Sequence, residues 1–149
     1  YERCTKRIMD QIKVFLDSDV LISAFLSKTG ASFAILKNPK ITKVISKTVK
    51  EEVLEVVTRL NLNLPNKDIF PDIKIITLEL EKPRLSETYF PYVLDEEDSH
   101  VVVGAHKAKV NFLLTHNLRH YHTVKIKNDF GINVMKPGLF LQYFRSLGV

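Results

Sequence analysis

The sequence holds a single cysteine, Cys4, among 149 residues. A lone cysteine excludes a disulfide within the chain and any zinc cage built from cysteines. No apolar run approaches the roughly 20 residues that a membrane-spanning helix needs. Residues 1–10 carry charges throughout and have no continuous apolar core, so they lack the pattern of a secretory signal. These absences favour a cytoplasmic protein with no membrane partner.

The sequence also has no internal repeat, no low-complexity tract and no linker-like stretch. With 45% hydrophobic and 26% charged residues, its composition is typical of a globular domain. We therefore predict a single domain over residues 1–149, with residues 1–11 as a candidate N-terminal extension. The net charge of +5 is compatible with a polyanionic partner such as RNA, although many basic proteins bind no nucleic acid.

Short β-branched runs alternate with helical patterns along the chain. The predicted strands are 12–16, 41–45, 111–115 and 132–135. The predicted helices are 20–26, 31–36, 47–60 with Ser46 as N-cap, 97–109, and 138–147 opened by Pro137. Residues 67–81 are open between a helix weakened by Pro71 and a strand at 73–76. Residues 61–66, 82–95 and the stretch from 116 to 127 are predicted loops.

Alternating strands and helices predict a three-layer α/β/α fold with a central, mostly parallel sheet of about five strands. In such sheets, ligands bind beyond the carboxyl ends of the strands. Asp17 and Thr115 both fall at predicted strand ends. The carboxyl edge of the sheet is therefore where we expect chemistry.

Asp17 and Asp19 form the first acidic region. Asp17 directly follows a strand that should be buried, so the strand delivers its carboxylate to the edge of the sheet. Asp19 has two interpretations that the sequence leaves open: a functional acid, or the N-cap of the helix that follows.

The acidic residues of the helix predicted over 47–60 point in different directions. Its apolar stripe consists of Val49, Val53, Val56, Val57 and Leu60. Glu52 lies at the margin of this stripe, whereas Glu51 and Glu55 point away from it. A carboxylate that faces the core is costly unless a cation or hydrogen bonds satisfy it. Glu52 is therefore the candidate functional acid of this helix.

The third acidic region is 95–98, ahead of a helix. The helix dipole favours acids in a first turn, so Asp95, Glu96 and Glu97 need no further explanation. Asp98 differs because apolar residues follow it at the spacings of one helix face, Val101, Val102 and Ala105. Inward carboxylates from all three regions would repel one another without a cation. A hard ion such as Mg²⁺ or Mn²⁺ suits such an all-oxygen site.

At this point the sequence resembles the PIN-domain family of metal-dependent nucleases, from about Lys13 to the C-terminus. Residues 14–25 resemble its opening signature, 52–57 its acidic helix and 95–101 its third acidic motif. Residues 112–121 resemble its fourth motif, and 132–141 its final strand and helix. Many members have an acid where this chain has Asn117, which puts the fourth carboxylate in doubt.

The resemblance implies a divalent-metal-dependent endoribonuclease, and commonly the toxin of a toxin–antitoxin pair. An antitoxin protein and a second copy of the chain are then candidate partners. The implied catalytic and metal-binding residues are Asp17, Glu52 and Asp98, with Asp19 and Asp95 helping a second ion. Ser23, Thr115 and Asn117 are the residues expected to position water or a scissile phosphate. Arg119 and His120 are the expected contacts to RNA phosphates.

Other interpretations remain open. The stretch from Phe15 to Val20, with its two aspartates, resembles the haloacid-dehalogenase phosphatase signature, but the downstream Gly-Asp pair of that family is missing. A PIN-like RNA-binding or assembly module without activity is the non-enzyme alternative. A zinc site is a further alternative, although the histidines lack the helical spacing of known zinc motifs. They are His100, His106, His116, His120 and His122. Apolar residues at helical spacing suit the core or a partner surface, namely Leu21, Phe25, Phe33 and Leu36.

Overall fold

A computed structural model describes residues 12–62, 72–78 and 87–148. Five strands form one parallel sheet in the order β3-β2-β1-β4-β5. The strands are β1 (Lys13–Leu16), β2 (Thr42–Ser46), β3 (Ile73–Ile76), β4 (Phe112–Leu114) and β5 (Asn133–Met135). The predicted parallel sheet of about five strands is confirmed, and the open segment 73–76 is a strand.

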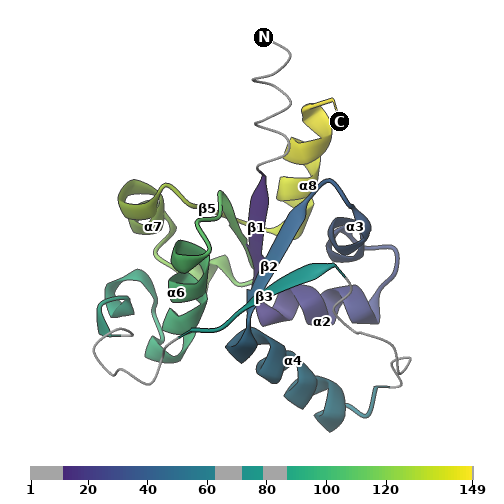
Figure 1. The fold of residues 1–149 in the computed structure, drawn as a ribbon, viewed down its shortest axis with the longest axis horizontal. Helices are drawn as coiled ribbons and strands as arrows, with labels where there is room; N and C mark the ends of the chain where they lie inside the picture. The colour runs from purple at the N-terminus through teal and green to yellow at the C-terminus, as the bar shows by residue number, and fades with distance from the viewer. Residues whose placement is uncertain (1–11, 63–71, 79–86, 149) are drawn as a thin grey trace.

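Helices cover both faces of this sheet, which confirms the three-layer α/β/α fold. In Figure 1, α6 (Ser99–Lys107) and α7 (Thr123–Phe130) lie on one side of the strands. The other side carries α2 (Ser18–Leu26), α3 (Ala31–Lys37) and α8 (Pro137–Ser146), while α4 (Lys47–Arg59) packs against β2 and β3. Three short 3₁₀ turns complete the described residues: η1 (Phe90–Tyr92), η2 (Glu96–Asp98) and η3 (Leu118–His120).

The helix starts follow their caps. Ser46 Oγ accepts a hydrogen bond from Val49 N at 3.1 Å, so the predicted N-cap of α4 is confirmed. Pro137 occupies the first turn of α8, as predicted. The first helix begins at Ser18 rather than residue 20, because the side chain of Asp17 accepts from Ser18 N. Asp17, and not Asp19, is therefore its cap.

The prediction of a loop over residues 116–127 is wrong for its second half, because α7 runs from Thr123 to Phe130. Ile126 is the one buried residue of this helix, and no side chain caps its start. A single buried position gives almost no apolar periodicity from which to predict a helix. Lys125 and Lys127 consequently project from a helix rather than from a loop.

Helix α6 lies unusually close to the central strand β1. A Cβ built on Gly104 would stand 2.4 Å from Cζ of Phe15, and real Cβ atoms do not approach a neighbour so closely. Phe15 is fully buried, so its ring has nowhere to retreat. Glycine at this position therefore lets α6, and the acidic turn that precedes it, rest directly on the sheet.

We expect Gly104→Ala to lower the free energy of unfolding by about 1–3 kcal/mol, the usual cost of an added methyl group in a filled core. Chemical denaturation measures this loss. Gly138→Ala is the matched control, since a Cβ on Gly138 in α8 meets nothing within 4 Å. Equal stability of the two variants would show that α6 is not held at this close approach.

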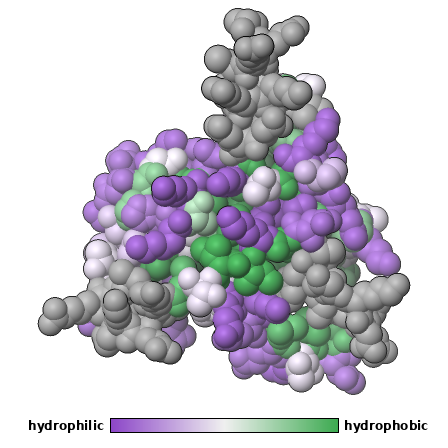
Figure 2. Space-filling model, viewed as in Figure 1, coloured by the Kyte–Doolittle hydropathy of each residue, from purple (hydrophilic) through white to green (hydrophobic). Residues whose placement is uncertain are grey.

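The face drawn in Figure 2 is mostly hydrophilic, with apolar surface gathered at its centre over the edge strand β3. Ile75 on this strand is 40% exposed. Within the described ranges, no single helix has both the length and the apolar composition to cross a membrane. Only α2 and α3 taken together pass that test, and they are bent by 98° at the break between them.

Candidate active site

The candidate site lies where the chain order of the sheet reverses. β1 and β4 are neighbours, with Leu16 paired to Leu114 at their carboxyl ends. One strand continues toward β2 and β3, the other toward β5, so β1 and β4 flank the topological switch point. Asp17 N donates to Leu114 O at 3.0 Å, which sets Asp17 beside Thr115. Two residues 98 positions apart in sequence thus share one edge.

Asp17 is held by three donors. Its Oδ1 accepts from Ser18 N at 2.8 Å. Its Oδ2 accepts from the hydroxyls of Thr115 at 3.0 Å and Tyr121 at 2.8 Å. Two donors fill the lone pairs of Oδ2, whereas Oδ1 keeps one lone pair for a further partner. The carboxylate is therefore fixed in orientation and offers one oxygen outward.

Tyr121 is a site residue that the sequence did not reveal. It is 5% exposed, and burial followed by the charge of Asp17 raises the pKa of its hydroxyl. A phenol with a raised pKa stays protonated, so it acts only as a donor toward Asp17. The charges of Asp98 and Asp19 also raise the pKa of Tyr121, so this hydroxyl interacts electrostatically with all three acids. No motif or period in the sequence distinguishes this tyrosine from a core residue.

Asp19, in the first turn of α2, faces the turn that follows β4. Its Oδ2 accepts from Asn117 Nδ2 at 3.0 Å and from His116 N at 3.1 Å. Burial and then the charge of Asp17 raise the pKa of Asp19 to about 6, although the hydrogen bond from His116 N lowers it. The structure thus brings Asp17, Asp19, Thr115 and Asn117 together at the switch point.

This raised pKa predicts a pH dependence. The folded pKa of Asp19 lies above its ordinary value of 3.8, so the stability it contributes is present below about pH 4 and is lost as pH rises through about 6. A cation near Asp17 favours the ionised form. We therefore expect Mn²⁺ affinity to increase between pH 5 and pH 7, in calorimetric titrations. Asp19→Asn should flatten this profile; an unchanged profile in that variant would contradict the assignment.

Asp98 ends the turn η2 and precedes α6. Burial and then the charge of Asp17 raise its pKa, so these two carboxylates interact. His120 Nδ1 lies 3.4 Å from Asp98 Oδ2 and is one of the charges that oppose the rise. Asp95 is exposed, and its Oδ1 accepts from Glu97 N at 3.0 Å as the cap of η2. Asp98 therefore belongs to the site, and Asp95 lies at its margin.

Glu52 pairs with a histidine, His100, that lies between it and Asp98 in the electrostatics of the site. Its Oε1 lies 2.7 Å from His100 Nε2, and the charge of His100 in turn lowers the pKa of Asp98. Glu52 Oε1 is shielded from solvent and lacks an aligned hydrogen bond, as does His100 Nδ1. The His100 side chain is 13% exposed, so it is not the surface histidine that the sequence suggested. Glu51 and Glu55 are exposed, as predicted.

The donor atoms of these acids determine whether the site suits a divalent ion. Among the described residues, no three Asp, Glu, His or Cys side chains stand in a preformed metal-binding group. The donors are nonetheless carboxylate oxygens. Burial followed by the charge of Asp17 raises the pKa values of Asp19 and Asp98, and Glu52 Oε1 is buried without an aligned donor. Such a set suits a hard cation.

The remaining predicted site residues lie around this centre. Ser23 is half-buried on α2, while Arg119 and His120 are exposed on η3. His116 Nε2 lies 3.3 Å from Ser32 Oγ, and His106 Nδ1 lies 2.7 Å from the Tyr89 hydroxyl. These histidines form no metal group in the described ranges, so the zinc alternative has no support. Leu21 is buried, and Phe25 and Leu36 pack against the core.

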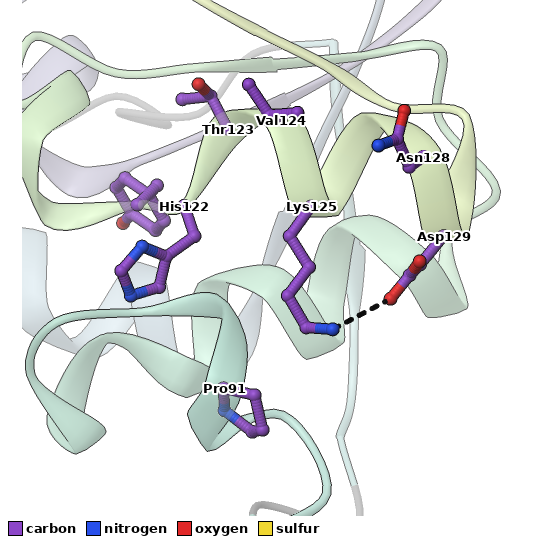
Figure 3. A pocket seen from close by; sticks show the side chains of 8 residues that line it. Pro91, His122, Thr123, Val124, Lys125, Asn128 and Asp129 are labelled. Carbon is purple, nitrogen blue, oxygen red and sulfur yellow. Dashed lines mark ion pairs between the residues drawn. The ribbon is translucent and has the colours of Figure 1, made fainter.

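An open hollow of about 810 Å³ lies between η1 and α7. Figure 3 shows Pro91 on one wall and the helix with Lys125 on the other, with His122 at one end. Tyr121 also lines it, so the residue that donates to Asp17 connects the hollow to the acids. Lys125 is held at 3.4 Å from Asp129 and lies 5.1 Å from the Tyr92 ring centroid.

Comparison with known proteins gives one positive finding. The family model for the PIN domain matches residues 13–119, which is more than half of the chain and includes Asp17, Asp19, Glu52 and Asp98. No curated protein sequence matches. The match favours the PIN domain over the haloacid-dehalogenase alternative. PIN domains have a nuclease-type fold and typically use divalent metals. By fold, site and family model, this chain belongs to the PIN-domain family.

Proposed function

We propose that this chain is a divalent-metal-dependent endoribonuclease that hydrolyses RNA phosphodiester bonds. One observation carries the proposal: Asp17 and Asp19 both lie within hydrogen-bond reach of Thr115 Oγ1 at the switch point of the sheet, and burial followed by the charge of Asp17 raises the pKa values of Asp19 and Asp98. A structural role does not account for like charges in partial burial, since each raises the cost of the others. A cation and a phosphate substrate account for them.

Asp17 and Asp98 would hold Mg²⁺ or Mn²⁺, with Glu52 as a third ligand if it leaves His100. The ion would lower the pKa of a bound water and neutralise charge that develops on the phosphate. Thr115 and Tyr121 fix the carboxylate of Asp17 by hydrogen bonds, so its free Oδ1 lone pair is already oriented. Ser23, Asn117 and Asp95 would orient water or the scissile phosphate.

RNA would reach the acids along η3 and the hollow beside α7. Arg119 and His120 are exposed next to Asp98, where cationic side chains suit backbone phosphates. The hollow is open and has both polar and apolar walls, which suits an unpaired nucleotide better than a duplex. The net charge of +5 supports attraction to a polyanion.

We further propose that the protein acts in the cytoplasm as the toxin of a toxin–antitoxin pair. The partner would be an antitoxin protein, and a second copy of the chain is the other candidate. Leu26 at 60% and Leu139 at 56% exposure are apolar side chains available to such partners. The toxin role follows from what is common in the family rather than from any contact in this chain.

Incubation of the full chain with a labelled panel of single-stranded and hairpin RNAs tests the proposal. We expect cleavage with Mg²⁺ or Mn²⁺ and none with EDTA. RNA binding without cleavage under every metal condition would instead identify the inert PIN-like module. Cleavage that survives EDTA in the wild type would contradict the metal-dependent mechanism. Equal cleavage by the Asp17→Asn variant would identify the activity as a contaminating ribonuclease.

A further inference from the structure

We propose that this site binds a single divalent ion. The reason is that Asn117 donates a hydrogen bond to Asp19, so this carboxylate does not need a second cation as its partner. The inference rests on the proposed function and deepens it, since it fixes the number of ions that the site takes. It concerns the side of the site formed by α2 and the turn after β4. Asp17, which shares the hydroxyl of Thr115 with Asp19, would hold the ion together with Asp98.

The contact itself is specific. Asn117 Nδ2 donates to Asp19 Oδ2 at 3.0 Å, and the same oxygen accepts from His116 N at 3.1 Å. An ionised carboxylate only accepts hydrogen bonds, so the amide must present its nitrogen rather than its oxygen. These donors use both lone pairs of Asp19 Oδ2; Thr115 Oγ1 also lies 3.3 Å from this oxygen, and His116 N lies 3.3 Å from Oδ1. The backbone holds the amide in place, since Asn117 N donates to Thr115 Oγ1 at 3.1 Å.

Charge balance leads to the same result. Asp17, Asp19 and Asp98 carry three negative charges when ionised, and one divalent ion leaves about one uncompensated. The amide hydrogens of Asn117 and the His116 N–H supply partial positive charge at Asp19 without an ion. An acid at position 117 would instead face Asp19 across about the same 3.0 Å, and two carboxylates at that distance need a proton or a cation between them.

Counting bound Mn²⁺ on the full, chelator-treated chain tests this inference. Calorimetry and electron paramagnetic resonance should find one tightly bound ion in the wild-type protein. Asn117→Asp should raise the count to two, with a spectrum broadened by coupling between neighbouring ions. Gln142→Glu is the matched control, since it adds one charge on an exposed position of α8 and should leave the count at one.

A thermal measurement guards against misfolding of the variant. Without metal, Asn117→Asp should melt several degrees below the wild type because its two carboxylates repel, and Mn²⁺ should restore more of that loss than it adds to the wild type. Two tight ions in the wild type, or one in a folded Asn117→Asp, would overturn the inference. Absence of both Mn²⁺ binding and RNA cleavage would instead reject the proposed function, so the two failures can be told apart.

Discussion

Asp17→Asn is expected to reduce metal-dependent RNA cleavage by roughly 10³-fold or more while the fold stays intact. The ion would use the lone pair of Asp17 Oδ1 that Ser18 N leaves unoccupied, since Thr115 and Tyr121 bind Oδ2, and an amide is a far weaker ligand for a hard cation. Single-turnover cleavage of a labelled RNA measures the loss. Mn²⁺ binding, followed by calorimetry, should weaken in parallel.

Asparagine is the informative replacement because Asp17 is also the cap of α2. Asparagine caps a helix about as well as aspartate, whereas alanine would cost about 1 kcal/mol of stability as well. The hydroxyls of Thr115 and Tyr121 can accept from the new amide by rotating. The pKa of Asp19 should also fall from about 6, since Asp17 is its second largest cause. Cleavage that persists in a folded Asp17→Asn would exclude Asp17 as a metal ligand.

Asp98→Asn should cause a loss of similar size, on the order of 10³-fold in kcat/KM. Burial followed by the charge of Asp17 raises the pKa of Asp98, so its charge is the second that the cation would neutralise. Its side chain makes no capping hydrogen bond to α6, and the replacement should leave stability almost unchanged. Cleavage kinetics at saturating Mn²⁺, together with thermal denaturation, measure both quantities.

Glu97→Gln provides the comparison for Asp98, because Glu97 is an exposed acid of the same turn η2 and carries the same charge. We expect its cleavage rate to stay within about twofold of the wild type, as a solvated charge is screened. If Glu97→Gln and Asp98→Asn lost activity equally, the effect would be general electrostatics on RNA binding. The specific role of Asp98 would then be rejected.

Much of this site could be predicted from the sequence, because strand ends and helix faces are local patterns. Asp17 follows the apolar strand β1, whose last three residues are all buried, and Asp98 precedes a helix whose inward face is apolar. Parallel pairing then brings the ends of β1 and β4 to one edge, which places Thr115 beside Asp17. The turn of Thr115 to Asn117 was expected in the site, and the structure places it against Asp19.

The remaining parts depend on contacts between distant residues, which no period in the sequence encodes. Tyr121 meets Asp17 across 104 positions, and the short helix α7 that follows it has a single buried residue. His100 is partly buried and pairs with Glu52 of α4, a contact between distant residues. Lys43 is 3% exposed in β2, where its Nζ donates to the carbonyls of Leu36 and Asn38. Burial of such a cation requires tertiary partners.

A crystal of the full chain soaked in Mn²⁺ and measured at the manganese absorption edge tests the central claim most directly. The account predicts one anomalous peak bonded to carboxylate oxygens of both Asp17 and Asp98, with Asp19 still hydrogen-bonded to Asn117. Glu52 would then be seen either on the ion or still paired with His100. No peak among these acids at saturating Mn²⁺, or a peak only at the histidines, would contradict it.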